Sequence, residues 1–443
     1  MATTIEESHE FDSIFACVCD LNGTLRGKRV PMDQARKVAD GEIRMPLSVA
    51  NVDIWGEDIE NSELVFKSGD ADGVCERVDR ALIPVTWTHR PSALALLWMR
   101  HEDGTPFMGD PRCALATVTE RFKASGLTPV VATEMEFYLC DPSNPQPRAA
   151  HSPLTGRPSP AGVLSLEELE QFEAFLNDVY DACMAQDIPA DAVISEGGAG
   201  QFEVNMKHIA DPLRAADNAI LFKRLVRGIA RQHGFCATFM AKPFGEAPGN
   251  GMHVHFSLTD DQGRNVFDNG ADAGTPLLHN AIAGLLATMH ENTLVFAPHA
   301  NSFRRLQANS HAPTRVAWGY ENRTTALRIP GGDHKARRIE HRVAGADANP
   351  YLVLASVLGG ALTGIEQQLT PAKPITGDGY KQGATQLPET WNSAIKAFED
   401  GKYVQQIYSK QLKRMFVQCK TQELARFSRQ ITDFEYQSYL EIV

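Results

Sequence analysis

The 443-residue sequence lacks the motifs and segments that mark several large classes of protein. It has no Gly-x-Gly-x-x-Gly motif and no Walker loop, so neither a Rossmann dinucleotide site nor a P-loop is expected. Its most apolar run, Ala93–Met99, is far shorter than the roughly 20 residues that a membrane-spanning helix needs. Met1–Ser8 has no basic region and no apolar stretch, so we expect no secretory or transit peptide and a cytoplasmic location.

Paired cysteines and an excess of positive charge are also missing. The eight cysteines include no Cys-x-x-Cys pair, and no His pair has zinc-finger spacing, so reduced thiols are expected. Lys and Arg number 43 against 55 Asp and Glu, which gives a net charge of −12 at pH 7. Such a surface repels duplex nucleic acid and anionic membranes, although local arginine clusters could still bind a small anion. We therefore expect neither nucleic acid nor a membrane as a partner.

The composition is that of an ordinary soluble globular protein, with 43% hydrophobic and 22% charged residues. Its length is too great for one compact core and indicates two or more domains. In the first hundred residues, turn signals separate short runs of β character at Ile14–Cys19, Leu64–Phe66 and Ala93–Met99. We predict a small β-rich domain over residues 1–105 and a larger domain over residues 106–443.

The larger domain mixes helical and strand patterns without regular βαβ alternation. Asp110 and Pro111 supply a helix N-cap and a proline at the first helical position, which predicts a helix over about 111–125. Leu164–Gln186 has the pattern of one long helix, and Pro129–Leu139 has that of a strand. Together these patterns indicate the α+β fold class.

One predicted strand carries two carboxylates on the same face. A period of two places Glu134 and Glu136 on one side and the apolar Met135 and Phe137 on the other. Like charges one pleat apart raise each other's pKa unless a cation compensates them. A divalent metal ion is one explanation for this pair, and a solvated strand face is the other.

Two further predicted strands alternate polar or charged residues with apolar ones. The polar faces of these strands consist of His253, His255 and Ser257 in one, and Arg338, Glu340 and Arg342 in the other. Burial of so many polar groups is costly unless they meet partners. Three such strands in one chain favour a shared metal and phosphate site over isolated core residues.

A Gly-rich loop between Glu196 and Glu203 adds two more carboxylates, and its glycines let the backbone approach a ligand closely. Planar guanidinium groups, which bind phosphate and carboxylate oxygens in a bidentate way, concentrate further along the chain. These residues are Arg304, Arg305, Arg323, Arg328, Arg337, Arg338 and Arg342. Carboxylates and His for divalent cations, with Arg for oxyanions, predict a phosphoryl-transfer site without a P-loop.

These motifs resemble those of the glutamine synthetase family, specifically the bacterial type I enzymes and their amine-ligating relatives. The resemblance covers nearly the whole chain, and the segments that carry it are 20–28, 134–137, 196–203, 251–255, 301–306, 322–330, 335–340 and 348–351. It implies a β-grasp-like N-terminal domain and a catalytic domain with a curved antiparallel sheet flanked by helices. It also implies a homo-oligomer, a dodecamer of two stacked hexamers with active sites between subunits.

The resemblance implies ATP and at least two divalent ions, Mg²⁺ or Mn²⁺, as cofactors. By motif position, the residues that hold the two ions are Glu136, Glu196 and Glu203 for one and Glu134, His253 and Glu340 for the other. The residues implied to bind L-glutamate are Gly249, Arg305 and Arg342, and those implied to face ATP are His255, Ser257, Lys335 and Arg338. Two more arginines, Arg323 and Arg328, are implied to stabilise the phosphate during transfer.

The reaction implied by the resemblance has two steps. The γ-carboxylate of glutamate attacks the γ-phosphate of ATP to give γ-glutamyl phosphate, and an amine then displaces the phosphate. Asp20 of a neighbouring subunit is implied to hold the cationic amine and to help deprotonate it. His311 stands where ammonia-using members carry a flap Glu. A neutral imidazole accepts a proton but supplies no negative charge, so the use of ammonia is in doubt.

We therefore expect the γ-glutamylation of an organic amine, with putrescine or another polyamine ahead of other alkylamines. The pattern over residues 20–28 also looks more like the γ-glutamylpolyamine synthetases. Such a reaction would belong to polyamine catabolism and nitrogen metabolism. Two alternatives stay open, namely an ammonia-dependent glutamine synthetase and a catalytically silent family member that responds to nitrogen.

Overall fold

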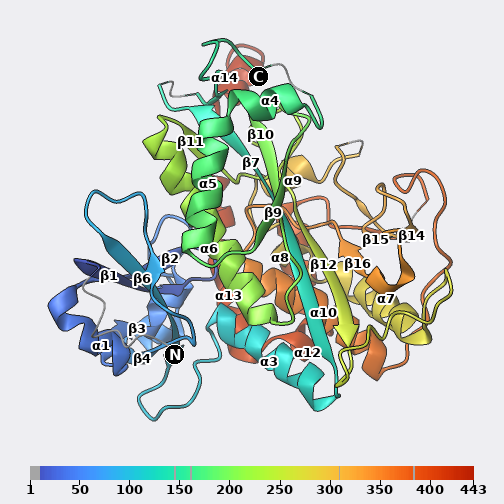
Figure 1. Cartoon of the computed structure of the whole chain (residues 1–443), viewed down its shortest axis with the longest axis horizontal. Coiled ribbons are helices and arrows are strands. Elements are labelled where there is room, and N and C mark those ends of the chain that lie inside the picture. The colour runs from blue at the N-terminus through green and yellow to red at the C-terminus, as the bar shows by residue number, and fades with distance from the viewer. Residues whose placement is uncertain (1–9, 144–145, 160–161, 309, 383–384) are drawn as a thin grey trace.

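The computed structural model describes residues 10–143, 146–159, 162–308, 310–382 and 385–443. These residues form two main sheets with helices around them, and the smaller, N-terminal sheet lies to one side of the larger one (Figure 1). The predicted α+β class is confirmed, since most neighbouring strands in both sheets are antiparallel.

The N-terminal sheet has the strand order β2-β1-β6-β4-β3, and β5 pairs with β6. Its strands are β1 (Ser13–Cys19), β2 (Leu25–Pro31), β3 (Ile43–Pro46), β4 (Asp72–Arg77), β5 (Ile83–Pro84) and β6 (Ser92–Arg100). The short helical segments of this region are η2 (Met32–Gln34), α1 (Ala35–Ala39), η3 (Leu47–Asn51) and α2 (Glu63–Phe66). The predicted strand at Leu64–Phe66 is therefore wrong. An i,i+4 ion pair of 2.5 Å between Lys67 and Glu63 supports a helical turn there.

The larger sheet has the order β14-β15-β16-β12-β7-β10-β9, with β8 and β11 also paired to β7. Its strands are β7 (Thr128–Asp141), β8 (Arg148–Ala149), β9 (Ala190–Ser195), β10 (Gln201–Met206), β11 (Cys236–Thr238), β12 (Met252–Thr259), β14 (Trp318–Tyr320), β15 (Leu327–Ile329) and β16 (Ile339–His341). A separate ribbon pairs β13 (Arg315–Val316) with β17 (Thr385–Gln386). The predicted strand over 129–139 is confirmed as the central strand β7.

Four helices begin with the same pair of signals, a capping side chain followed by proline. Each capping side chain accepts a hydrogen bond from a backbone N–H of the first turn, and proline follows it directly. The capping residues are Asp110, Asp211, Thr275 and Asn349. The helices that they start are α3 (Pro111–Ala124), α6 (Pro212–Gln232), α7 (Pro276–Met289) and α10 (Pro350–Glu366). The other helical segments are α4 (Leu166–Gln171), α5 (Glu173–Ala185), α8 (Thr293–Phe296), α9 (Ser302–Arg305), η4 (His334–Ala336), α11 (Trp391–Asp400), α12 (Val404–Ile407), α13 (Lys410–Phe427) and α14 (Asp433–Tyr439).

The single helix predicted over Leu164–Gln186 is two helices, α4 and α5, that meet at Phe172. Phe172 is 1% exposed, and its ring packs against Phe202 and Phe235 at centroid distances of 5.3 and 5.8 Å. Its φ of −108° departs from helical geometry. The anchored ring thus accounts for the break.

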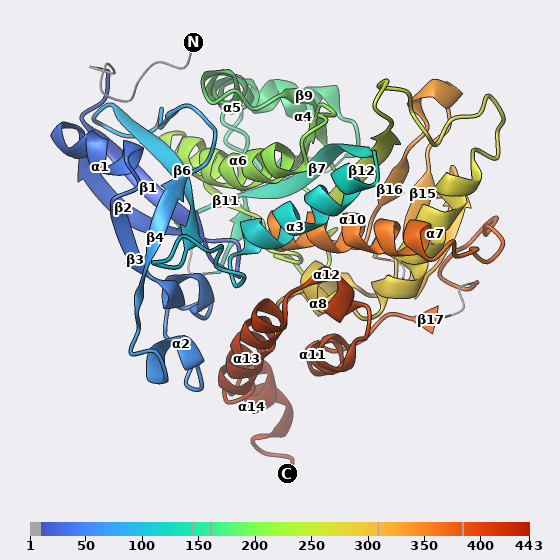
Figure 2. The same cartoon turned by 90° about the horizontal axis from the view of Figure 1, so that it is seen from below.

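Helix α10 is the centre of the helical layer, with residues 350–364 buried. It contacts α3, α6 and α7, and Figure 2 shows α3, α10 and α7 along one side of the large sheet. A Cβ at Gly284 of α7 would lie 2.2 Å from the carbonyl oxygen of Gly360 in α10, so the two helix backbones pack in direct contact. No helix among the described residues is long and apolar enough to cross a membrane.

Helix α13 ties the N-terminal region to the rest of the chain. Lys420 and Glu423 are both fully buried and lie 2.8 Å apart, and Asn22 donates to Glu423 at 2.9 Å. The backbone N–H of Ile54 also donates to Glu423, at 2.8 Å. Buried charges are tolerated when they are paired in this way. The predicted boundary at residue 105 falls between β6 and α3 and stays a prediction.

Candidate active site

A cavity of about 720 Å³ opens beside the central strands β7, β10 and β12. Many of its lining side chains are acidic or basic, and segments far apart in the sequence supply them. The predicted site residues that line it are Glu134, Glu136, Glu196, Glu203, Gly249, His253, Arg305, His311, Arg323 and Arg342.

Strand register places the charged side chains on one face of the sheet. Glu134 lies opposite His253, and Glu136 lies opposite Glu203. Directly opposed residues of an antiparallel pair project to the same side, as the alternation in the sequence predicts. In the order of the strands, this row consists of Arg328, Glu340, His255, His253, Glu134, Glu136 and Glu203.

Two groups in this row have the composition of divalent metal sites. Each group has three ligand atoms within 4.8 Å of one another, and the groups are Glu134, His253 and Glu340, and Glu136, Glu203 and His253. Carboxylate oxygens and imidazole nitrogens are suitable ligands for Mg²⁺ or Mn²⁺. Glu196 lines the same cavity but lies outside both groups.

The first group already has cationic or hydrogen-bonding neighbours. His253 Nδ1 and His255 Nε2 each lie 2.9 Å from a carboxylate oxygen of Glu134. Burial alone raises the pKa of Glu134, but these hydrogen bonds hold it well below its usual range. Burial likewise opposes the charge of Glu340, and the nearby Arg342 guanidinium lowers its pKa to about 2. Both carboxylates are therefore charged at neutral pH.

Glu203 of the second group, and Glu196 in the same cavity, form no ion pair with a cationic side chain in the described part of the chain, and Asn205 donates to Glu203 at 2.9 Å. Burial, together with the charges of Glu134 and Glu136, raises the pKa of Glu203 to about 9. Burial and the charge of Glu136 raise the pKa of Glu196 to about 7. A divalent cation beside these carboxylates would remove the repulsion between them. The donor set therefore fits a metal ion.

Metal affinity should depend on pH, because Glu196 and Glu203 must lose protons to bind a cation. Below their raised pKa values protons compete with the ion, and this competition ends as pH rises through about 7 and then about 9. Each proton that is released on metal binding lowers the Kd of the ion by up to about tenfold per pH unit. We expect the Kd of Mn²⁺, measured by titration calorimetry, to be at least about tenfold lower at pH 8 than at pH 6. A Kd that is equal at the two pH values would contradict this assignment of protons.

The residues predicted to bind glutamate meet at one side of the cavity. Arg305 and Arg342 are 5% and 7% exposed, and Arg305 donates to the carbonyl oxygen of Val343 at 2.8 Å. A Cβ at Gly249 would lie 2.8 Å from Cγ of Arg305, so glycine is needed for this approach. Two nearly buried guanidinium groups form a suitable site for carboxylates.

The residues predicted to face ATP lie outside the lining of this cavity, on a continuation of the same row. Arg338 Nε donates to His255 Nδ1 at 3.2 Å, and Ser257 follows on the same face of β12. Lys335 lies in η4 and is exposed. The His208 ring, which sequence reasoning missed, lies 6.1 Å from that of His255. The structure thus extends the polar row beyond the carboxylates.

Three of the four residues predicted to act on the reacting groups have different surroundings. Arg323 and His311 line the cavity, and both are exposed to it. His311 has φ of 65°, in the left-handed region that residues other than glycine rarely adopt. Arg328 donates to Glu340 at 2.8 Å, so its guanidinium contacts a predicted metal ligand.

Asp20 is not part of this cavity. It is fully buried, and it accepts from Arg26 Nε at 2.9 Å and from the backbone N–H groups of Asn22 and Thr24 at 2.9 and 2.8 Å. Burial raises the pKa of Asp20, and these bonds oppose the rise. Its contacts stabilise its own turn. A role for Asp20 in the active site of a neighbouring subunit stays a prediction.

Sequence reasoning missed the apolar part of the lining and a tyrosine. Val163 and Leu164 are each 64% exposed and lie in the cavity near Glu196, together with Pro248. Tyr380 also lines it, and burial raises its pKa while Arg342 and Arg305 oppose the rise. These residues stand in irregular segments, where no periodic pattern marks a function.

Comparisons with known proteins agree with this geometry. The family model described as glutamine synthetase, catalytic domain, matches residues 108–439. The chain is 37% identical to γ-glutamylputrescine synthetase PuuA of Escherichia coli (strain K12), over 95% of this chain and 90% of that protein. It is 31% identical to glutamate–isopropylamine ligase of a Pseudomonas species, over 99% of this chain and 96% of that protein.

A solved structure of GmaS without ligand superimposes on the whole chain, with a TM-score of 0.87, 27% identity and full coverage of both chains. The predicted glutamine synthetase fold is confirmed. The family model covers most of the chain, and the relatives cover nearly all of it. The chain therefore belongs to the glutamine synthetase family of ATP-dependent ligases, which form carbon–nitrogen bonds.

Proposed function

We propose that the chain joins the γ-carboxylate of L-glutamate to a primary alkylamine, with putrescine or a related polyamine first among them. The observation that carries the choice of amine is the exposed aliphatic surface of Val163 and Leu164 inside the charged cavity. An alkyl chain gains from contact with this surface, whereas ammonium has no apolar part to bury. The activities named for the two curated relatives, with putrescine and isopropylamine, support the same choice.

In the first step, the proposed roles follow the geometry of the cavity. Arg305 and Arg342 hold the carboxylates of glutamate, and Arg323 neutralises charge on the phosphoryl group as it moves. The proposed holders of the two divalent ions are Glu136, Glu196 and Glu203, and Glu134, His253 and Glu340. When bound, such ions neutralise phosphate oxygens and lower the barrier to transfer. The proposed contacts of ATP are His255, Ser257, Lys335 and Arg338.

In the second step, an amine attacks the acyl phosphate and must first lose a proton. The His311 imidazole lines the cavity and accepts that proton in the proposed mechanism. Arg328 holds Glu340 at 2.8 Å and so positions a proposed metal ligand. The proposed amine site of this chain contains His311, Val163 and Leu164, and Asp20 of a neighbouring subunit stays the predicted holder of the cationic amine.

A rate assay over a panel of amines tests this proposal. ATP hydrolysis coupled to glutamate is measured with putrescine, isopropylamine, ethylamine and ammonium. Burial of a CH₂ group stabilises binding by about 0.8 kcal/mol, which amounts to up to about 3 kcal/mol for putrescine. We therefore expect kcat/KM for an alkylamine to exceed that for ammonium at least about tenfold. Ammonium as the best substrate would point to a glutamine synthetase, and no turnover with any amine would point to a silent family member.

Replacing Leu164 with Asn should lower kcat/KM for putrescine by about three- to tenfold and leave the value for ammonium unchanged, because it removes apolar contact area. Asn tolerates the φ of 61° that Leu164 adopts. Leu154→Asn is the matched control, since Leu154 is 73% exposed and lies outside the cavity lining. Equal losses for putrescine and ammonium would show that Leu164 does not contact the alkyl chain.

Replacing His311 with Glu should move the preference from alkylamine toward ammonium by about tenfold or more. A carboxylate adds a charge-assisted contact, worth about 1.5–3 kcal/mol, to a substrate that binds through charge alone. His311→Ala should slow amine transfer because the proton acceptor is lost. For each variant, the ratio of kcat/KM for putrescine to kcat/KM for ammonium is compared with the same ratio for the wild type. If both variants kept that ratio, His311 would have no part in the amine step.

We also propose that the chain acts in the cytoplasm as a ring of subunits, a dodecamer of two stacked hexamers. The C-terminal helix α14 and the residues after it support a subunit contact, because they expose Phe434, Leu440 and Ile442 at 70–80%. Multi-angle light scattering measures the mass directly. A monomeric mass would contradict this assembly.

A further inference from the structure

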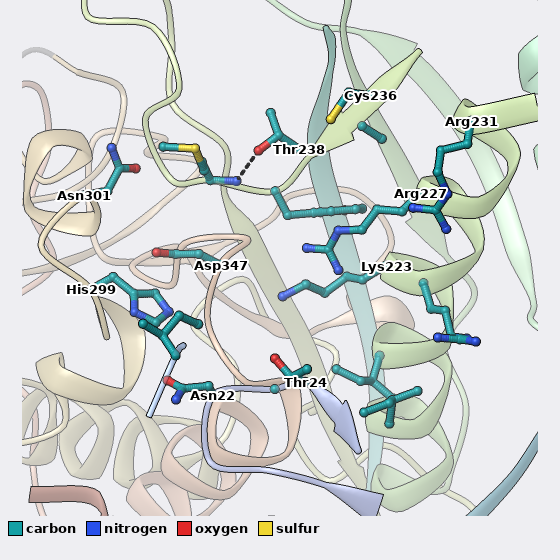
Figure 3. A pocket seen from close by; sticks show the side chains of 18 residues that line it. Asn22, Thr24, Lys223, Arg227, Arg231, Cys236, Thr238, His299, Asn301 and Asp347 are labelled. Carbon is teal, nitrogen blue, oxygen red and sulfur yellow. Dashed lines mark hydrogen bonds between the residues drawn. The ribbon is translucent and has the colours of Figure 1, made fainter. Parts of the chain in front are cut away.

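A second cavity, of about 540 Å³, lies between the N-terminal region and the large sheet (Figure 3). It shares no lining residue with the candidate active site. The turn at residues 22–25 and Ile54 form one wall, and helix α6 forms another. The chain from β11 to Met240 and the loop at residues 299–301 complete it.

Helix α6 presents a stripe of positive charge to this cavity. Lys223, Arg227 and Arg231 are four residues apart and so share one helix face, and Arg224 lines the cavity beside them. Figure 3 shows Lys223 and Arg227 extending from α6 into the cavity. A chain with a net charge of −12 thus gathers four basic side chains around one hollow.

Hydrogen bonds from these cations are few in the described part of the chain, and Lys223 and Arg227 lie over the Phe239 ring, 5.7 and 5.1 Å from its centroid. Lys223 is 3% exposed, and the hydrogen bond recorded for its ammonium goes to the carbonyl oxygen of Ala348 at 3.2 Å. The Arg224 guanidinium lies over the rings of Phe15 and Trp87, 5.6 and 6.0 Å from their centroids, and both rings are outside the cavity lining. Lys223, Arg227 and Arg231 are therefore the cations that face the cavity. Asp347 is the acidic residue of the lining, and its Oδ2 accepts from Ser302 at 2.6 Å. Burial and the charge of Arg227 lower the pKa of Lys223 to about 7, which an anion would reverse.

We propose that this cavity beside α6 binds a small organic phosphate. A phosphate group carries about −1.5 to −2 charges at pH 7, and the lining has an excess of basic over acidic side chains, which is opposite in sign. Planar guanidinium groups bind its oxygens in a bidentate way, and the buried Lys223 ammonium supplies a point charge. Ile54, Ile220 and Met240 offer apolar surface for the organic part of the molecule.

Titration calorimetry on the full-length protein tests the site with inorganic phosphate, glycerol 3-phosphate and succinate. We expect both phosphates to bind more tightly than succinate. The Arg227→Gln/Arg231→Gln double variant, which changes two exposed side chains of the stripe, should weaken phosphate binding at least about tenfold and keep ligase activity. The single Arg231→Gln variant should weaken it about threefold. Arg214→Gln is the matched control, because Arg214 lies in the first turn of the same helix but pairs with Asp187 at 2.5 Å outside the cavity.

The active-site variant Arg323→Gln separates this cavity from the catalytic one, since inorganic phosphate is also expected to bind beside Arg323. Phosphate binding to the α6 stripe should persist in Arg323→Gln. Loss of all phosphate binding in Arg323→Gln, or unchanged binding in the double and single stripe variants, would overturn the proposal. Succinate that binds as tightly as the phosphates would also overturn it.

Discussion

Replacing Glu203 with Gln is expected to lower metal-dependent ATP turnover by about 10³-fold or more while raising the thermal stability of the metal-free protein. The substitution removes one carboxylate of the second metal-binding group. An ion held there lowers the activation barrier by several kcal/mol. A barrier raised by about 4 kcal/mol corresponds to a rate about 10³-fold lower. Stability rises because burial and the charges of Glu134 and Glu136 raise the pKa of Glu203 to about 9, so that Glu203 must take up a proton on folding at pH 7, whereas Gln is neutral in both states.

The opposite signs of these two effects distinguish a metal ligand from a residue needed for folding. Thermal unfolding is measured with and without Mn²⁺, beside the coupled ATPase rate. Glu170→Gln serves as control, because Glu170 is an exposed glutamate on α4 and both quantities should stay unchanged. The ion should raise the melting temperature of the wild type but barely that of Glu203→Gln. An active Glu203→Gln variant would show that Glu203 holds no catalytic ion.

Replacing Arg323 with Lys is expected to lower kcat by about 10²-fold with little change in the Kd of ATP. Lysine keeps the charge but loses the planar fork that contacts two phosphate oxygens at once. Loss of a contact that is made only in the transition state lowers kcat and leaves substrate binding unchanged. Removal of one such hydrogen-bond donor lowers kcat by about 10²–10³-fold. Arg323 lines the cavity together with Glu196, and its charge opposes the rise in the pKa of that carboxyl, which places Arg323 near the proposed metal ions.

Single-turnover rates and ATP titration separate the two quantities for Arg323→Lys. Arg304→Lys is the matched control, because Arg304 is exposed on α9 and lines a different cavity. A weaker Kd for ATP with an unchanged kcat would assign Arg323 to ground-state binding instead. Equal effects in both variants would exclude a specific role for Arg323.

The part of the site that lies on strands could be predicted from the sequence. The side-chain period of two fixes which residues share a face, so Glu134 and Glu136 had to project together. The sequence could not say which carboxylates would be compensated. The compensation depends on how the strands pair. The register of β7 against β12 places His253 beside Glu134. The pairing of β15 with β16 places Glu340 beside Arg328. These partners are separated by many residues in the chain.

Features in irregular segments could not be predicted in the same way. The break at Phe172 follows from ring packing against Phe202, a contact with no signal in local helix propensity. Asp20 is held partly by a residue far along the chain, because Asn349 donates to its backbone carbonyl oxygen at 2.9 Å. The apolar surface at Leu164 depends on where a loop returns to the cavity. Tertiary contacts set all of these features.

A competition between amines tests the central claim most directly. Wild-type protein is incubated with ATP, Mg²⁺, L-glutamate and equal concentrations of putrescine and ammonium, and the products are counted by mass spectrometry. The apolar lining at Val163 and Leu164 predicts that γ-glutamylputrescine exceeds glutamine by at least about tenfold. A mixture in which glutamine is the main product would contradict the account.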